Sequence, residues 1–376
     1  MNFPLILVAI AGAFIAYING ANDVSKGIAT LVGSGVTDYR RAILWGTVCT
    51  GAGTFFGALV AQAMVETFGG GFLSKGIAPT FAAALAMILG AAACVTLATR
   101  TSMPVSTTHA IVGSIAGVAV IAHGIGGFQW AAVTDRIALP LLLSPVLALA
   151  IASVAIRILR KVQGRFAQRA TCLCAEYEPA PALIAVGRQE TALQMASLPQ
   201  VRLVTGSVES CNARQPFSLR LTTAHMHWLS SGATSFSRGM NDAPKMVALV
   251  LVASMLRSGA ALRTPAFLIV GLGIMAGSWL AGRRITSVLA EKITPMSDWE
   301  GLIANVVTTL LVAPGAMLGL PMSTTHVSTG SIMGIGLHRK MNWRTVREMV
   351  LAWVVTLPVA GMLGAMIYLG LRLLHT

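Results

Sequence analysis

The amino-acid sequence predicts an all-α polytopic membrane protein. Of its 376 residues, 55% are hydrophobic and only 11% are charged, whereas a soluble protein needs about 25% charged residues to cover its surface. Apolar runs of roughly 20 residues, the length that spans a bilayer as a helix, recur along the chain. The composition therefore excludes a disulfide-rich secreted scaffold and a soluble nucleic-acid-binding protein, and no nucleic-acid partner is expected. The net charge of +14 suits cytoplasmic loops and is compatible with an anionic solute.

Seven stretches are long and apolar enough to cross the membrane, and four further apolar stretches are interrupted by Gly, Pro, Ser or Thr. The seven are residues 3–19, 42–65, 77–98, 137–158, 264–282, 300–317 and 348–371. The interrupted stretches are residues 20–36, 103–123, 225–256 and 318–337. Because unpaired backbone groups cannot face lipid, we expect broken or re-entrant helices that are buried in protein or line a wet cavity.

One stretch between the apolar segments is polar. Residues 157–222 contain 9 Lys or Arg against 4 Glu, and a basic cluster opens the stretch. Such a cluster at the end of a membrane span marks the cytoplasmic side, so residues 157–222 are predicted to form a cytoplasmic linker insert. Short alternating runs, such as residues 201–204, indicate a small β element within it. The insert separates a first membrane repeat, residues 1–156, from a second, residues 223–376.

Two polar motifs occur in the same order in both halves. The first reads GANDVSK at residues 20–26 and GMNDAPK at residues 239–245; the second reads PVSTTH at residues 104–109 and PMSTTH at residues 321–326. From Asn to Pro the separation is 82 residues in one half and 80 in the other. This pattern predicts an internal duplication, typical of secondary transporters with a site near the bilayer midplane. The pattern leaves open whether the copies are inverted or parallel.

The second motif is suited to binding an anion. Proline is favoured in the first turn of a helix, so we expect helices to begin near Pro104 and Pro321. Their free N–H groups and the positive end of the helix dipole attract anions. Six hydroxyl groups add uncharged donors, from Ser106, Thr107, Thr108, Ser323, Thr324 and Thr325. Alternatively, these hydroxyls bond to their own or adjacent helices, but their occurrence in two copies favours the anion site.

The first motif is suited to binding a cation. A carboxylate at membrane depth is costly and normally has a partner, and the oxygens of Asn22, Asp23, Asn241 and Asp242 suit a small cation or, at Asp, a proton. The alternative role is a helix N-cap, which can coexist with cation binding. No metal site beyond the coupling cation is predicted.

Four further residues can support these sites. Lys26 and Lys245 each follow an Asp by three residues, about one helical turn. Pairing with the Asp ranks first, ahead of contacting the anion or reaching the membrane surface. His109 and His326 end the second motif, where they can relay protons or donate to the substrate. Simple packing is the equal alternative.

Together, the duplicated motifs resemble those of the inorganic phosphate transporter (PiT) family, in particular its bacterial members, over both membrane halves but not residues 157–222. The resemblance implies cation-coupled symport of inorganic phosphate across the cell (inner) membrane by alternating access, with Na⁺ or H⁺ and no other cofactor. It also implies two inverted repeats, about 10–12 membrane segments and a homodimer. Carried over by motif, the six Ser and Thr residues hold phosphate and the Asn-Asp pairs hold the cation.

The sequence departs from the family at two places. Many members carry Glu in membrane helices where this chain has Thr54 and Asn305, which leaves the cation open. A sulfate permease on the same scaffold is the alternative, but hydrogen phosphate can donate a proton to an acceptor such as Asp, whereas sulfate cannot. A membrane-embedded hydrolase is a remote alternative, because a duplicated Ser-Thr-Thr-His run fits an ion path better than one active site. The chain is therefore not expected to be an enzyme.

Overall fold

The computed structural model describes residues 3–74, 76–166, 172–178, 200–206, 219–254, 260–338 and 341–374. The chain divides into two compact units. One unit is helical and comprises residues 1–156 and 227–376, and the other comprises residues 157–226 and contains a small sheet.

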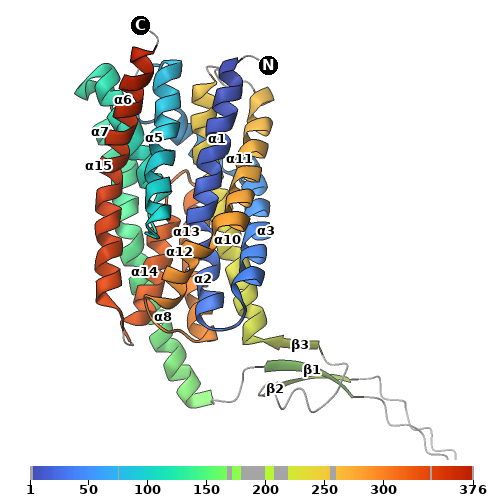
Figure 1. Ribbon diagram of the computed structural model, residues 1–376. Coiled ribbons are helices and arrows are strands. Elements are labelled where there is room, and N and C mark those ends of the chain that lie inside the picture. Colours follow the sequence, from blue (N-terminus) through green and yellow to red (C-terminus); the bar gives the residue numbers. More distant parts are fainter. Residues whose placement is uncertain are drawn as a thin grey trace, which may run out of the picture. The chain divides into compact units, whose positions relative to one another are not determined.

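The helical unit is built from long apolar helices (Figure 1). In chain order its main helices are α1 (Phe3–Asp23), α2 (Ser25–Gly33), α3 (Tyr39–Val60), α4 (Gln62–Gly70), α5 (Phe81–Arg100), α6 (Thr107–His123), α7 (Trp130–Val133), α8 (Leu139–Phe166), α10 (Thr223–Ala253), α11 (Ala260–Ala281), α12 (Arg283–Glu291), α13 (Asp298–Met317), α14 (Thr324–Gly336) and α15 (Trp343–Leu373). Within the described residues, seven segments are long and apolar enough to cross a membrane, which confirms the seven predicted stretches. One of the predicted interrupted stretches, residues 103–123, contains a shorter apolar helix, Thr107–His123.

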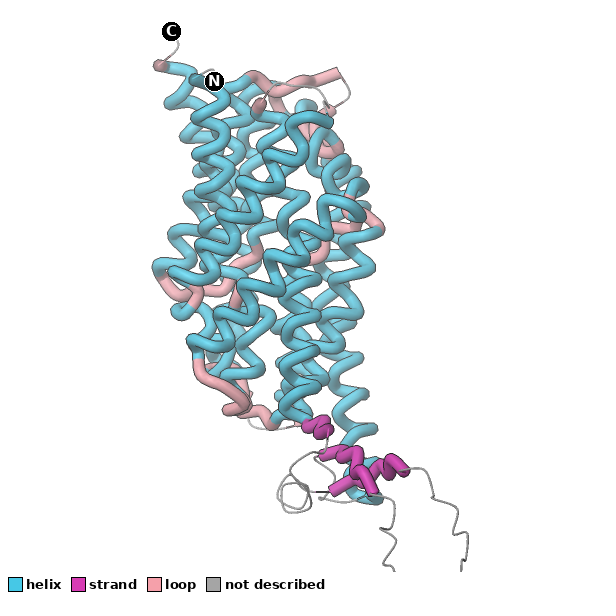
Figure 2. The backbone as a smooth tube through the Cα atoms, turned by 90° about the vertical axis from the view of Figure 1, so that its right-hand side faces the viewer, coloured by secondary structure: helices cyan, strands magenta, loops and turns pink. Residues whose placement is uncertain are grey.

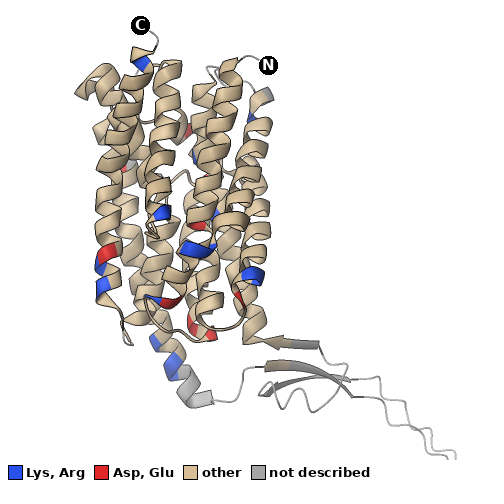
Figure 3. Ribbon diagram, in the orientation of Figure 1, with Lys and Arg blue, Asp and Glu red and all other residues tan. Residues whose placement is uncertain are grey.

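The surface of this unit is apolar, and its interior holds charged groups. Leu59 is 79% exposed and Leu142 is 70% exposed, whereas Asp23, Lys26 and Lys245 are buried. Figure 3 shows acidic and basic residues at mid-height of the bundle as well as at its ends. Apolar side chains facing outward and charges facing inward are the arrangement that a lipid environment requires.

The two copies of the first motif differ in backbone structure. α1 ends at Asp23 and α2 begins at Ser25, but Val24 between them has helical dihedral angles (φ −56°, ψ −32°) and still donates to the Gly20 carbonyl at 3.1 Å, so the interruption is confined to one residue. α10, in contrast, is one helix through Pro244, and the break predicted within residues 225–256 is wrong. A proline inside a helix removes one N–H and crowds the preceding turn, yet the flanking turns of α10 continue.

Two helical hairpins carry the second motif. α5 and α6 form one, and α13 and α14 form the other. The second helix of each hairpin packs closely on a long helix of the other half. A Cβ added to Gly113 of α6 would lie 2.2 Å from the Leu357 carbonyl oxygen of α15. A Cβ added to Gly330 of α14 would lie 2.4 Å from the Pro145 carbonyl oxygen of α8. Glycine is required at both positions because no side chain fits between these backbones.

The helices of the two halves correspond in order. α1 with α2, then α3, α4, α5, α6 and α8, are followed in the second half by α10, α11, α12, α13, α14 and α15. In Figure 1 the α5–α6 hairpin lies in the upper part of the bundle and the α13–α14 hairpin in the lower part. Figure 2 shows loops within the height of the bundle as well as at its ends.

The second unit contains a three-stranded antiparallel sheet with strand order β2-β1-β3. β1 (Cys172–Glu178) pairs with both β2 (Gln200–Gly206) and β3 (Leu219–Thr222), and Cys172 lies opposite Gly206 on one side and Thr222 on the other. The small β element predicted at residues 201–204 is confirmed as part of β2.

Candidate functional site

In the first half, the two polar motifs are in direct contact. The side-chain amide of Asn22 donates to the Val105 carbonyl at 2.8 Å and to Asp23 Oδ1 at 2.6 Å. The Thr107 hydroxyl donates to Asp23 Oδ2 at 3.0 Å. Asp23 is therefore held between the end of α1 and the start of α6.

The second half repeats this contact at the equivalent residues. The side-chain amide of Asn241 donates to the Met322 carbonyl at 3.0 Å and to Asp242 Oδ1 at 2.8 Å. Val105 and Met322 each follow the proline of the second motif. The duplication seen in the sequence thus extends to individual hydrogen bonds.

The two halves also meet each other. The Thr325 hydroxyl of α14 donates to the Val105 carbonyl at 2.9 Å, and Lys245 Nζ donates to the Thr108 hydroxyl at 2.9 Å. The rings of His109 and His326 lie 4.7 Å apart between centroids. The starts of α6 and α14, 217 positions apart in their first residues (Thr107 and Thr324), therefore lie together in the interior.

Both helices begin later than the prolines predict. Ser106 and Ser323 are the N-caps, and each hydroxyl accepts the N–H of the histidine three residues on, at 3.3 Å. Pro104 and Pro321 therefore lie before the helices rather than in their first turns. Ser106 and Ser323 are extended, and the carbonyls of the residues before them, Val105 and Met322, accept from the Asn side chains. The N–H groups of the two Thr residues before each histidine still have no acceptor within their own helix.

The two motif lysines pair with the motif aspartates, the role ranked first. Lys26 Nζ lies 2.8 Å from Asp23 Oδ1, and Lys245 Nζ lies 3.4 Å from Asp242 Oδ1. Lys26 is 2% exposed and Lys245 is 1% exposed, so neither reaches the membrane surface.

Sequence reasoning missed two residues of this site, Asn19 and Arg238. Asn19 donates to Asp23 Oδ2 at 2.7 Å and to Asp242 Oδ2 at 3.4 Å, and Arg238 Nε lies 3.9 Å from Asp242 Oδ2. Each precedes its motif aspartate by four residues, so they occupy equivalent positions in the two repeats. Extending the alignment of the halves a few residues before the first motif would have found both.

His326 and the two positions of family departure, Thr54 and Asn305, are buried, whereas His109 is partly buried. The rings of His326 and Trp353 lie 4.0 Å apart between centroids and are tilted by 39°, and His326 Nδ1 lies 3.4 Å from the Leu141 carbonyl. Thr54 and Asn305 are buried, and within the described part of the chain the Thr54 hydroxyl and the Asn305 amide nitrogen have no hydrogen-bond partner.

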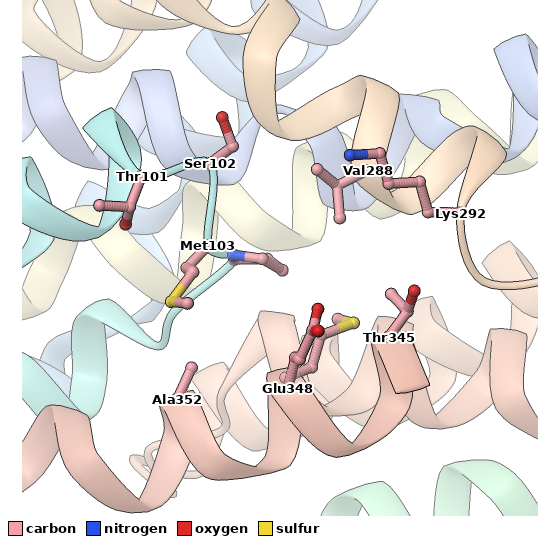
Figure 4. Close-up of a pocket in the computed structure, with 10 residues that line it drawn as sticks. Thr101, Ser102, Met103, Val288, Lys292, Thr345, Glu348 and Ala352 are labelled. Carbon is pink, nitrogen blue, oxygen red and sulfur yellow. The ribbon is translucent and has the colours of Figure 1, made fainter. Parts of the chain in front are cut away.

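A pocket of about 150 Å³ adjoins the turn of the α5–α6 hairpin. It is bounded by residues 101–104, by Val288 and Lys292 at the end of α12, and by Thr345, Glu348 and neighbouring residues of α15. Figure 4 shows Lys292 and Glu348 on facing sides of this space. Because Pro104 forms part of its wall, the pocket reaches to within two residues of the α6 N-cap.

A multi-pass helical bundle with duplicated polar motifs in its interior defines the class of the protein as a membrane transporter. The model of the phosphate transporter family matches residues 19–364, and the chain belongs to this family. A protein of Pyrococcus horikoshii named "Putative phosphate permease" is 28% identical over 98% of both chains. A chloroplastic inorganic phosphate transporter of Arabidopsis thaliana is 26% identical over 95% of this chain and 70% of its own length.

The fold is also that of a solved structure. The protein described as the sodium-dependent phosphate transporter superposes with a TM-score of 0.77 at 22% identity, covering 99% of this chain and 100% of its own. The family and its relatives are transporters of phosphate rather than enzymes, which agrees with the function predicted from the motifs.

Proposed function

We propose that the protein moves inorganic phosphate across the cell (inner) membrane by cation-coupled symport, with phosphate held between the starts of α6 and α14. The observation that carries this proposal is the meeting of the two helix starts, where Thr325 bonds to the Val105 carbonyl. The first-turn N–H groups of Thr107 and Thr108 in α6 and of Thr324 and Thr325 in α14, each pair at the positive end of a helix dipole, then converge on one region. The hydroxyls of the motif, led by Ser106 and Ser323, complete the binding site with neutral donors.

The surrounding charges also favour an anion. The buried charge cluster (Asp23, Lys26, Arg238, Asp242 and Lys245) contains three basic and two acidic groups, a net charge of +1 when all are ionised. A dihydrogen phosphate ion neutralises this charge. Phosphate is favoured over sulfate because it can donate a proton to a carboxylate, whereas sulfate can only accept.

Alternating access is supported by the order and placement of the helices. We infer that the two halves are inverted repeats, since their helices correspond in order while the two hairpins lie at opposite ends of the bundle (Figure 1). The pocket lined by Lys292 and Thr345 then serves as the route from one side of the membrane to the α6 start. We place residues 157–222 in the cytoplasm and expect a homodimer, which chemical cross-linking in membranes tests.

The proposal is tested by uptake of radiolabelled phosphate and sulfate into proteoliposomes under imposed ion gradients. Concentrative uptake of phosphate is expected, with weak competition by sulfate. Ser106→Ala and Ser323→Ala should each raise the KM for phosphate about fivefold, the value of one neutral hydrogen bond. Ser287→Ala, which removes a hydroxyl that bonds within α12, is the matched control. Preferential uptake of sulfate, or an unchanged KM in both variants, would contradict the proposal.

A further inference from the structure

The ammonium groups of the two motif lysines lie among oxygens of the kind that bind a metal cation. Lys26 Nζ contacts Asp23 Oδ1 at 2.8 Å and donates to the Asn22 carbonyl at 2.6 Å. Lys245 Nζ donates to the Met322 carbonyl at 3.0 Å and to the Thr108 hydroxyl at 2.9 Å. Carboxylate, carbonyl and hydroxyl oxygens are hard ligands, the set that small cations such as Na⁺ select.

We propose that the ammonium groups of Lys26 and Lys245 occupy the two cation positions of this site as tethered cations, so that phosphate transport by this protein is independent of Na⁺ and driven by protons. This inference rests on the proposed phosphate transport and names its coupling ion.

The charges of the site oppose a further metal cation. With Arg238 beside Asp242, the buried charge cluster already carries one more positive than negative charge. A Na⁺ ion bound at Asp23 would have to displace Lys26, which is 2% exposed. The oxygens that would coordinate this Na⁺, Asp23 Oδ1 and the Asn22 carbonyl, are those that Lys26 Nζ already contacts, so the ion has no coordination shell while the ammonium is in place.

A proton, in contrast, needs no coordination shell. The titratable and charged groups that face one another here are Asp23 of α1, Lys26 of α2, Arg238, Asp242 and Lys245 of α10, His109 of α6 and His326 of α14. A proton that enters with phosphate binds to a motif aspartate and neutralises it. The partner ammonium is then released to contact phosphate. When the proton leaves on the other side, the aspartate regains its charge, the ion pair re-forms, and phosphate is released.

The ammonium groups also differ between the repeats in a way that the test can use. Lys26 lies 2.8 Å from its carboxylate, whereas Lys245 lies 3.4 Å from its carboxylate and also contacts Thr108 of the other half. The Lys245–Asp242 ion pair is therefore the weaker of the two, and losing it should destabilise the fold less. Lys245→Asn is for this reason the single variant chosen for the test. The shorter amide leaves the site's oxygens in place and adds one more oxygen.

The first experiment measures phosphate uptake into proteoliposomes with either NaCl or choline chloride outside, with and without an inward proton gradient. The expected result is stimulation by the proton gradient and equal rates in the two salts. A requirement for Na⁺ would overturn the inference while leaving phosphate transport intact, as would uptake that neither gradient stimulates. Absence of phosphate uptake under every condition would instead reject the proposed function, and the inference with it.

The second experiment tests for Na⁺ binding directly, without measuring transport. The melting temperature of the purified protein is compared in NaCl and in choline chloride at equal ionic strength. The native chain should show no difference, whereas Lys245→Asn, and the double variant with Lys26→Asn, should be stabilised specifically by Na⁺. Lys161→Asn, at an exposed position of α8, is the matched control and should behave as the native chain. A Na⁺-specific shift in the native chain, or none in a folded Lys245→Asn protein, would overturn the inference.

Discussion

Replacing Asp23 by Asn tests the buried ion pair at the centre of the site. Asp23 receives hydrogen bonds from Asn19 at 2.7 Å, Asn22 at 2.6 Å and Thr107 at 3.0 Å, and it pairs with Lys26 at 2.8 Å. The Asn side chain has nearly the same shape but no charge, so Lys26 is left buried without its counterion. Removing one partner of a buried pair costs about 3–5 kcal/mol, against about 1 kcal/mol for a neutral hydrogen bond. The lost charge therefore dominates the effect.

The assay is thermal unfolding of the purified protein in detergent, combined with phosphate uptake. Asp23→Asn should lower the melting temperature clearly and abolish concentrative uptake. The double variant with Lys26→Met should be more stable than Asp23→Asn alone, because the orphaned charge is gone. Asp38→Asn, at the exposed N-cap of α3, is the matched control and should change little, since Asn caps a helix as well as Asp does. Additive effects of the two site substitutions, or full stability of Asp23→Asn, would refute the reasoning.

Three further substitutions test separate parts of the structure. Gly113→Val places a side chain where a Cβ lies 2.2 Å from the Leu357 oxygen, so folded protein in the membrane should be lost, whereas Gly370→Val, with nothing within 4 Å, should express normally. Arg238→Gln removes one positive charge from the buried charge cluster and should raise the KM for phosphate about tenfold. An unchanged KM would contradict the view that the net positive charge of this cluster favours phosphate. Thr325→Val should cost about 1 kcal/mol of stability through the bond to Val105, measured by thermal unfolding, and a neutral effect would argue against that contact.

Composition and apolar segment length were sufficient to predict the membrane class and all seven full-length spans. Equivalent residues of the duplicated motifs make equivalent contacts, because the two similar halves bring them to equivalent positions. The contacts of Asn22 with Val105 and of Asn241 with Met322 follow this rule.

Helix boundaries and charge placement were harder to predict. After each motif proline, the Ser and both Thr residues are all able to cap a helix, and the sequence does not say which one does so. The first motif contains a one-residue interruption at Val24, whereas its copy continues through Pro244, the residue expected from the sequence to break the helix. The contact of Asn19 with Asp242 joins α1 and α10, segments more than 200 positions apart in the sequence, so the sequence around Asn19 alone does not reveal it.

The central claim is that phosphate binds between the starts of α6 and α14. The most direct measurement is an experimental structure of the protein with bound phosphate. We predict phosphate density within hydrogen-bond distance of the first-turn N–H groups at Thr107 and Thr324, beside the buried charge cluster. Density located only elsewhere, for example beside Lys292 in the α12–α15 pocket, would contradict the account.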